Sequence, residues 1–193
     1  MLAAENTNHI YNKNAAQSCP TYMPQIYCFP PIEDSNARVL ILGSMPGKES
    51  LRLGQYYAHK RNAFWTIMGE LTGAAPSTPY ETRVQILKSA GIALWDVLAS
   101  CRRCSSMDSD IDEATPNDFK SFFRSHPHIT DVFFNGSMAE KCYQKHVHLE
   151  TLPLHYQRLP STSPAHASMA YDQKLKVWQA VMQSTHPAVQ QRS

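Results

Sequence analysis

Two segments of the chain concentrate the residue types that could bind and transform a ligand. The first begins with the turn Gly43-Ser-Met-Pro-Gly47 and continues through Gln55-Tyr-Tyr-Ala-His-Lys-Arg-Asn-Ala-Phe-Trp65. The second is Leu159-Pro-Ser-Thr-Ser-Pro-Ala-His166. Glycines in a Gly-x-x-Pro-Gly turn let the backbone come close to a ligand, although many turns share this pattern. The long aromatic connection, paired with Ser-Thr-Ser-Pro, is far more specific.

Two polar residues in this part of the sequence each allow two interpretations. Asn62 precedes an apolar helical face and is expected to cap that helix, a contribution of about 1 kcal/mol to stability. It could also act on a ligand, and the two roles are compatible. Asp96 ends an apolar run and could be a general base, or it could accept hydrogen bonds from loop amides.

Charge is informative only where it is concentrated. The net charge of +2 neither requires nor excludes a nucleic-acid partner. The loop 43–61 carries Lys48, Arg52, Lys60 and Arg61 against Glu49, which is a local positive excess. This loop therefore predicts a phosphate-bearing partner. The loop 98–114 mixes both signs and is expected to be a solvated surface.

Four apolar runs predict the strands that must position these segments. They lie at 38–43, 92–97, 130–135 and, more weakly, 155–159, with helical patterns between them. Strands that alternate with helices predict a three-layer α/β/α sandwich around a central, mainly parallel four-stranded sheet. Ligands of open parallel sheets bind beyond the carboxyl ends of the strands. Both chemistry-bearing segments follow such ends, so we expect them to meet in one cleft.

The length of 193 residues, 42% of them hydrophobic, suits one globular domain. We expect a flexible N-terminal tail at 1–20, an extended segment packed on the domain at 21–35, the domain itself at 36–184 and a C-terminal tail at 185–193. No stretch approaches the roughly 20 apolar residues of a membrane span, and the N-terminus lacks a signal pattern. The expected protein is an intracellular, cytoplasmic monomer that does not associate with membranes.

The five cysteines predict no disulfide framework, because their number is odd and the chain is expected to be intracellular. Cys101-Arg-Arg-Cys104 is a single Cys-x-x-Cys pair without a second pair at metal spacing. Free thiols in a loop are the favoured interpretation over a zinc or iron–sulfur site. We expect no metal and no cofactor.

With these motifs in view, the sequence resembles the uracil-DNA glycosylase superfamily, and within it the hypoxanthine-DNA glycosylase branch. The resemblance runs from about Cys28-Phe-Pro-Pro-Ile32 to the final helix and includes Trp95-Asp-Val97 and Phe134-Asn-Gly136. It implies an α/β/α fold, DNA with a deaminated base as partner, and hydrolysis of the N-glycosidic bond without a metal. Met45 stands where the superfamily usually places a catalytic Asp or Asn, and Lys60 stands where relatives usually carry proline.

The resemblance also assigns roles. Asn62 is the proposed catalytic amide, which would orient the water or an edge of the nucleotide by its dipole rather than as a base. Ser161 takes the position of the usual transition-state His or Asn. The other implied contacts comprise a substrate-binding set and a DNA-binding set. The substrate-binding set is Gly43, Ser44, Met45, Pro46, Tyr57, Phe64, Asn135 and Ser163, with Tyr57 or Phe64 stacking on the extruded base. The DNA-binding set is Lys48, Lys60, Arg61, Pro164, Ala165 and His166.

Alternative functions remain open at this point. A non-catalytic nucleic-acid-binding module could use the same crevice, because Met45 replaces the usual catalyst. A uracil-type glycosylase would share the fold. A bifunctional glycosylase/lyase could use the Lys60 amine. A serine hydrolase is disfavoured because the sequence contains no Gly-x-Ser-x-Gly elbow.

Overall fold

The computed structural model describes residues 25–103, 112–147, 153–166 and 169–185. The tail predicted at 1–20, residues 186–193 of the tail predicted at 185–193, and Cys104 lie outside these ranges, whereas Thr185 is the buried last residue of a helix. The helices are α1 Lys48–Leu53, α2 Phe64–Thr72, α3 Tyr80–Ser89, α4 Phe119–Ser125, α5 Ser137–His146, α6 Tyr171–Trp178 and α7 Ala180–Thr185, with a short 3-10 turn at Pro164–His166. The strands are β1 Gln25–Tyr27, β2 Val39–Gly43, β3 Ile92–Asp96, β4 Leu98–Arg102, β5 Asp112–Pro116, β6 Asp131–Asn135 and β7 His155–Leu159.

The central sheet has four strands in the order β3-β2-β6-β7, and every neighbouring pair is parallel. All four predicted strands are present, which confirms the predicted fold. The β2 strand is buried along its whole length because it lies in the interior of the sheet. Its two faces belong to two separate cores, as expected for a sheet covered on both sides.

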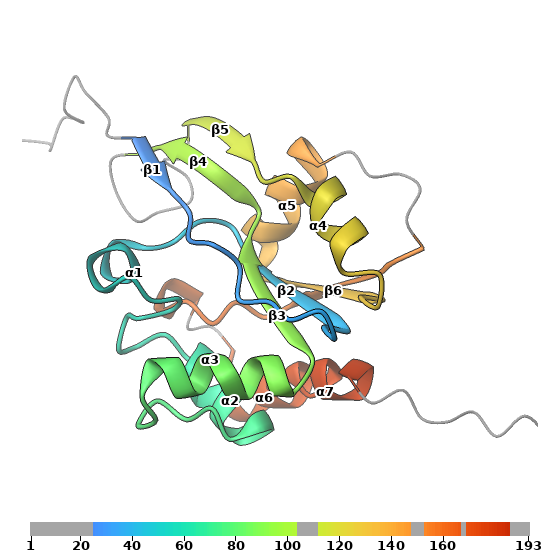
Figure 1. Ribbon diagram of the computed structural model, residues 1–193. Coiled ribbons are helices and arrows are strands. Elements are labelled where there is room, and N and C mark those ends of the chain that lie inside the picture. The colour runs from blue at the N-terminus through green and yellow to red at the C-terminus, as the bar shows by residue number, and fades with distance from the viewer. Residues whose placement is uncertain (1–24, 104–111, 148–152, 167–168, 186–193) are drawn as a thin grey trace, which may run out of the picture.

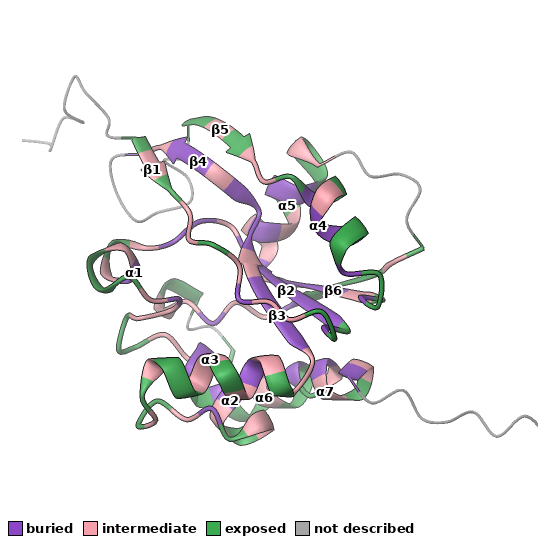
Figure 2. Ribbon diagram, in the orientation of Figure 1, coloured by how far each residue is buried: buried purple, intermediate pink, exposed green. Residues whose placement is uncertain are grey.

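Helices α2, α3, α6 and α7 cover one face of the sheet, and α4 and α5 cover the other (Figure 1). Val39 and Ile41 of β2 point into the first core, which includes Phe64 and Trp178. Leu40 and Leu42 point into the second, which includes Phe119. Figure 2 shows the buried strands enclosed between partly exposed helices. The molecule is therefore the predicted three-layer sandwich.

A second sheet was not predicted. Strands β1, β4 and β5 form an antiparallel sheet in the order β1-β4-β5, and β4 follows β3 after the single residue Val97. The prediction that 98–114 is a solvated loop is therefore wrong for 98–102 and 112–114. These strands lack clean hydrophobic alternation, since β5 reads Asp-Glu-Ala-Thr-Pro, and their pairing relies on the backbone.

Residues 25–35 lie along the β3–β4 edge of the molecule. The Cys28 N–H donates to the Ala99 carbonyl at 2.9 Å, and Ile32 forms an isolated antiparallel bridge with Leu94. The Phe29 carbonyl accepts a hydrogen bond from the Trp95 indole N–H at 3.2 Å. At its end, the Glu33 carboxylate lies 2.8 Å from His126 Nε2 beside α4.

Candidate active site

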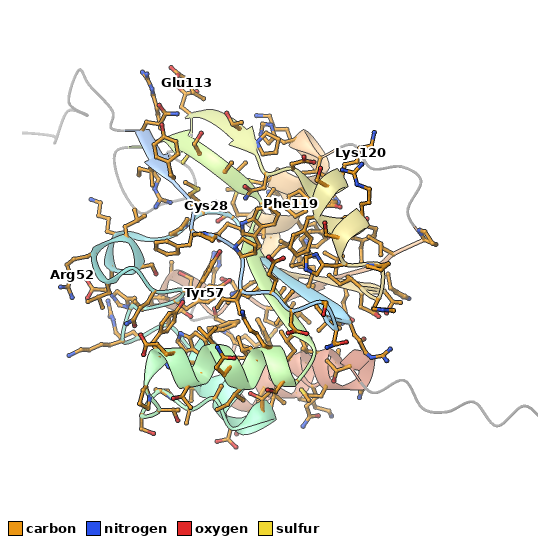
Figure 3. The ribbon with its side chains drawn as sticks, viewed as in Figure 1. Cys28, Arg52, Tyr57, Glu113, Phe119 and Lys120 are labelled. Atoms are coloured by element: carbon orange, nitrogen blue, oxygen red, sulfur yellow. The ribbon has the colours of Figure 1, made fainter. Side chains whose placement is uncertain are left out.

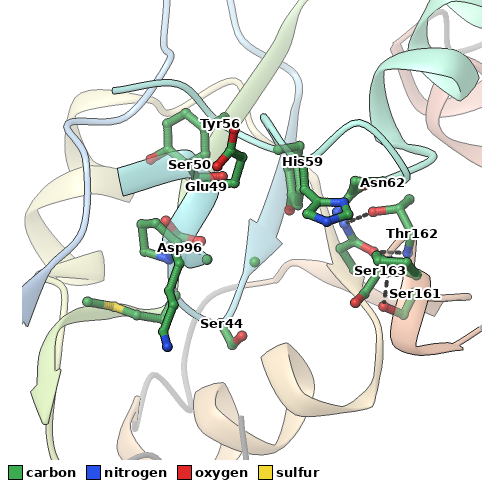
Figure 4. A pocket seen from close by; sticks show the side chains of 18 residues that line it. Ser44, Glu49, Ser50, Tyr56, His59, Asn62, Asp96, Ser161, Thr162 and Ser163 are labelled. Carbon is green, nitrogen blue, oxygen red and sulfur yellow. Dashed lines mark hydrogen bonds between the residues drawn. The ribbon is translucent and has the colours of Figure 1, made fainter. Parts of the chain in front are cut away.

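A cavity of about 370 Å³ opens at the carboxyl edge of the central sheet. This volume lies within the range of small-molecule sites. The segments 43–62 and 161–164 both contribute to its wall, together with Asp96 and Asn135 from neighbouring strand ends (Figure 4). The prediction that the two sequence segments meet in one cleft is confirmed.

Most of the predicted site residues line this cavity. Those that do are Gly43, Ser44, Met45, Pro46, Lys48, Tyr57, Asn62, Asn135, Ser161, Ser163 and Pro164. Lys60, Arg61, Ala165 and His166 are exposed and lie outside the lining, where they remain predicted DNA contacts. Phe64 does not line the cavity. Residues that line the cavity without having been predicted include Tyr56, His59 and Thr162.

The turn after β2 is held from two sides. The Val97 N–H donates to the Gly43 carbonyl at 2.8 Å, and the Leu98 N–H donates to the Ser44 carbonyl at 3.2 Å. The buried Arg103 guanidinium donates to the Pro46 carbonyl. Met45 is buried in the core formed with α4 and α5 and also contributes to the cavity lining. The turn is thus fixed by the strand that ends in Asp96 and by the outer sheet that begins after it.

Gly43 is required by close packing at the cavity wall. A Cβ atom on Gly43 would lie 2.5 Å from Asp96 Oδ1 and 3.0 Å from the Tyr57 hydroxyl. The missing side chain therefore leaves the space that the Asp96 carboxylate and the Tyr57 phenol share. Gly43 and Asp96 are register partners at the ends of β2 and β3.

Tyr57 has an unusual backbone for a bulky residue, with φ at 53°. Such left-handed conformations cost free energy and concentrate at functional sites. The Tyr57 ring stacks on Phe64 with ring centroids 4.1 Å apart, and Phe64 packs in turn against Trp178. The Trp65 indole donates to the Tyr56 carbonyl at 2.8 Å and so helps to fix this stretch (Figure 3 shows where Tyr57 lies).

The prediction that Phe64 contacts the substrate is wrong. Phe64 is fully buried in the core and lies behind Tyr57, so Tyr57 lines the cavity and Phe64 supports it. The sequence favoured Tyr57 as the ring that faces the pocket, but Phe64 was kept as an alternative because both belong to one aromatic run. The helical period starting at Phe64 did indicate a core position.

The position of Asn62 is compatible with both predicted roles, that of a helix-start residue and that of a ligand contact. The N-cap position of α2 is Ala63 and not Asn62 as predicted, but Asn62 Oδ1, one residue earlier, accepts a hydrogen bond from the Phe64 N–H at 3.0 Å, and Asn62 also lines the cavity. The next residue, Ala63, donates its N–H to the Thr162 carbonyl at 3.0 Å. This bond ties the first chemistry-bearing segment directly to the second.

The loop that follows β7 is clamped by Asn135. The Asn135 Nδ2 donates to Thr162 Oγ1 at 2.8 Å, and the Thr162 N–H donates to Asn135 Oδ1 at 2.9 Å. Asn135 was predicted to bind substrate, and it does line the cavity, but both ends of its amide bond the loop. Gly136, at φ 94°, allows the close approach, because a Cβ there would lie 2.8 Å from Ser161 Cβ.

Helix α6 holds the same loop from behind. The Lys174 Nζ donates to the Ser161 carbonyl at 2.6 Å and to the His166 carbonyl at 3.5 Å, and the Trp178 indole donates to the Pro160 carbonyl at 2.9 Å. Burial lowers the pKa of Lys174, while the carbonyl contacts favour its charged form. Ser161 Oγ accepts from the Ser163 N–H at 3.2 Å, which turns the loop on itself.

Electrostatics differ between the wall and the rim of the cavity. Asp96 places a carboxylate deep in the wall, and Lys48 lies at the lining near the surface. Burial first, and then the Asp96 charge, raise the pKa of Tyr56 far above its usual value, so Tyr56 stays a neutral phenol. Arg52 is paired with Glu49 at 2.7 Å, so the positive excess of this loop resides mainly in its lysines and Arg61.

The described part of the chain contains no group of three or more His, Cys, Asp and Glu side chains arranged to hold a metal ion. Within the same residue ranges, no helix has both the length and the apolar character that a membrane crossing requires. The cavity lining offers carboxylate, amide, hydroxyl and backbone groups.

Replacing Asn135 by alanine should lower the free energy of unfolding by about 2–3 kcal/mol, because both buried Thr162 groups lose their partner. Asn135→Asp should cost much less, since its carboxylate can accept from both the N–H and the hydroxyl of Thr162. Urea unfolding of the three proteins measures the difference. Equal stability of Asn135→Ala and the wild type would show that the loop is held by other contacts.

Comparison with known proteins identifies the fold and its family. The family model of the uracil DNA glycosylase superfamily matches residues 30–188, which is most of the chain. The chain belongs to this superfamily.

Two curated relatives are similar to this chain in sequence. A hypoxanthine DNA glycosylase of Methanosarcina barkeri is 39% identical over 112 residues, covering 58% of this chain and 71% of the relative. A hypoxanthine DNA glycosylase of Methanosarcina acetivorans is 34% identical over 154 residues, covering 79% and 95% respectively. A solution NMR structure from Methanosarcina acetivorans, provisionally described as a uracil DNA glycosylase, matches with a TM-score of 0.72 at 32% identity and covers 84% of this chain and 99% of that one.

Within this superfamily fold, three residues that the sequence did not single out help to build the site, two of them from outside the two motifs. Arg103 lies in a charge-mixed stretch that gave no sign of burial. Lys174 is one of two lysines on the last helical pattern. Thr162 lies inside the Ser-Thr-Ser motif, and its position between two predicted site residues was the one available signal.

Proposed function

We propose that this protein is a monofunctional DNA glycosylase that releases deaminated bases, with hypoxanthine preferred, for base excision repair. The observation that carries the proposal is the single cavity in which both motif segments meet, bounded by amide, hydroxyl and carboxylate groups. The names of the two curated relatives support hypoxanthine as the base.

The protein must promote three steps of the reaction. The nucleotide must leave the stack, at a cost of a few kcal/mol that falls for a mispaired lesion. The departing base must be held as negative charge develops on it, and a water must be aimed at the anomeric carbon. Tyr57, supported by Phe64, offers an aromatic surface beside the cavity for the extruded base.

The remaining roles follow from position. Asn62 Oδ1 is engaged with the Phe64 N–H, so its Nδ2 is the group best placed to donate to the base or the water. Ser161 and Ser163 would contact the base or the 3′ phosphate. Ala165 and His166, which are exposed just beyond Pro164, would enter the gap left in the duplex, while Lys48, Lys60 and Arg61 would contact phosphates.

Hypoxanthine suits a site of neutral donors. It offers a carbonyl, ring nitrogens and one ring N–H, all of which amides, hydroxyls and backbone groups can bind. We further propose a monomer as the acting species. An intracellular location with the DNA follows from the proposed substrate.

A lesion panel tests the function. Duplex oligonucleotides with one deoxyinosine, one deoxyuridine or no lesion are incubated with excess protein, and free base is quantified by chromatography with mass detection. We expect hypoxanthine release in preference to uracil, leaving an abasic strand that breaks only after alkali treatment. Faster release of uracil would favour a uracil-type enzyme, and binding without any base release would favour a non-catalytic module.

A separate experiment tests the alternative of a bifunctional glycosylase/lyase. Lys60 is exposed and lies outside the cavity lining, which argues against its amine reaching the anomeric carbon. Sodium borohydride added during turnover should therefore trap no protein–DNA adduct. A trapped adduct that disappears in Lys60→Met would overturn the monofunctional assignment.

A further inference from the structure

Asp96 is a carboxylate in the cavity wall that the motif-based mechanism does not use. It is the last residue of β3, is 3% exposed and lines the same cavity as Ser44 and Asn62 (Figure 4). Its Oδ1 occupies the space left open by Gly43, 2.5 Å from where a Cβ would stand. Its main chain is fixed as well, because its carbonyl accepts from Asn117 Nδ2 at 2.8 Å.

The first motif contains two other candidates for the proton acceptor, Met45 and Asn62, and neither can fill this role. Met45, at the usual position of the catalytic Asp or Asn, is a thioether buried in the core. Asn62 is an amide, which is a very weak base, and its oxygen already accepts the Phe64 N–H. A water that attacks a sugar must lose a proton, and a carboxylate is a far better acceptor than an amide.

We propose that Asp96 is the catalytic carboxylate of this protein, supplied by β3 in place of the residue that Met45 replaces in the turn after β2. This inference rests on the proposed glycosylase function. Asn62 then serves as a donor that orients the base or the water, and Asp96 serves as the acceptor. Both residues line the same cavity and come from different parts of the chain, Asn62 from the connection before α2 and Asp96 from the end of β3 (Figure 4).

The step balances without any further reactant. The bond between C1′ and N9 of hypoxanthine breaks, and its electron pair leaves with the base. The water oxygen forms a bond to C1′, and the proton of that water passes to the Asp96 carboxylate. Asp96 then returns the proton to the departing base or to solvent, which leaves free hypoxanthine and an abasic sugar. Before the transfer, the negative charge of Asp96 also favours the cationic sugar of the transition state.

The first test compares Asp96→Asn with the wild type under single-turnover conditions on deoxyinosine duplex. The substitution keeps the shape and removes the acceptor. We expect the cleavage rate to fall about 100-fold or more, with binding of the same duplex unchanged or tighter. Asp131→Asn, at the opposite end of the sheet on β6, controls for the loss of one negative charge and should cut like the wild type.

The second test supplies the carboxylate from solution. Asp96→Ala is assayed in sodium formate and, at matched ionic strength, in sodium chloride. We expect formate to accelerate cleavage at least about tenfold over chloride, an effect that a purely structural role of Asp96 would not produce. Should the Asp96 variants fail to fold, Gly43→Ala addresses the same carboxylate, because its Cβ displaces Oδ1, and it should cut about as slowly as expected for Asp96→Asn.

A folded Asp96→Asn that cuts within about threefold of the wild type would overturn the proposal. A slow Asp96→Ala that formate and chloride leave equally slow would also overturn it, as would a folded Gly43→Ala with wild-type rate. These outcomes differ from failure of the proposed function, in which the wild type itself releases no base from any duplex of the panel.

Discussion

Asn62→Ala should release hypoxanthine at least about 100-fold more slowly than the wild type, and it should lose only about 1 kcal/mol of stability. The large effect comes from the loss of the Nδ2 donor, because Asn62 lines the cavity and its Oδ1 is already engaged. The small effect comes from the Oδ1 acceptor, which caps the Phe64 N–H at 3.0 Å. Removing one preorganised donor from a transition-state site typically costs 100-fold to 1,000-fold in rate.

The two contributions of Asn62 can be separated with Asn62→Asp. A carboxylate caps a helix as well as an amide does, so this variant should keep wild-type stability. It has no donor, and it adds a second negative charge near Asp96, so its cleavage rate should fall at least as far as that of Asn62→Ala. The measurements are single-turnover cleavage and urea unfolding. If a folded Asn62→Ala cuts at the normal rate, the catalytic assignment fails, and Asn62 is only a helix cap.

Phe64→Ala should have the largest effect on stability, a loss of about 3–5 kcal/mol. Phe64 is fully buried and contacts Tyr57, Trp65 and Trp178. Deleting its ring leaves a cavity between the helices and the site, and a typical domain has only about 5–15 kcal/mol in total. The ring also supports Tyr57 in its strained backbone conformation, so the folded fraction of Phe64→Ala should also bind a lesion duplex more weakly.

Phe64→Leu is the matched control, because it keeps most of the volume and should lose less than about half as much stability. Urea unfolding curves and duplex titrations of both variants measure the two effects. If Phe64→Ala unfolds like the wild type but no longer binds DNA, Phe64 would act on substrate directly, and its placement in the core would be contradicted.

Elements whose signals are local could be predicted from the sequence. The strands β2, β3 and β6 are nearly continuous apolar runs, which parallel strands require because both of their faces are buried. Once these strands were predicted, the three-layer arrangement and the edge of the sheet at which a ligand binds could be predicted as well. The convergence of 43–62 and 161–164 followed from the same rule, without any information on contacts.

Features that depend on long-range pairing could not be predicted. Strand β5 pairs with β4 through backbone bonds that its polar sequence does not indicate. The Asn135–Thr162 clamp spans 27 residues, and Arg103 reaches Pro46 across 57. A buried arginine and a solvated one look the same in a sequence of mixed charge. The role of Phe64 was misjudged because an aromatic run does not reveal which ring lies in front.

The position of Lys174 changes how the loop 159–166 presents itself to an anion. That loop contains no lysine or arginine. The buried Lys174 amine nevertheless lies behind this loop. It donates hydrogen bonds to the main-chain carbonyls of Ser161 and His166, which are the negative ends of two peptide dipoles. A phosphate that approaches the loop would therefore be repelled less by these carbonyl oxygens, because the positive charge of Lys174 compensates their partial negative charge. The attraction of this surface for a polyanion thus originates in a helix several residues downstream, where a count of surface charges would overlook it.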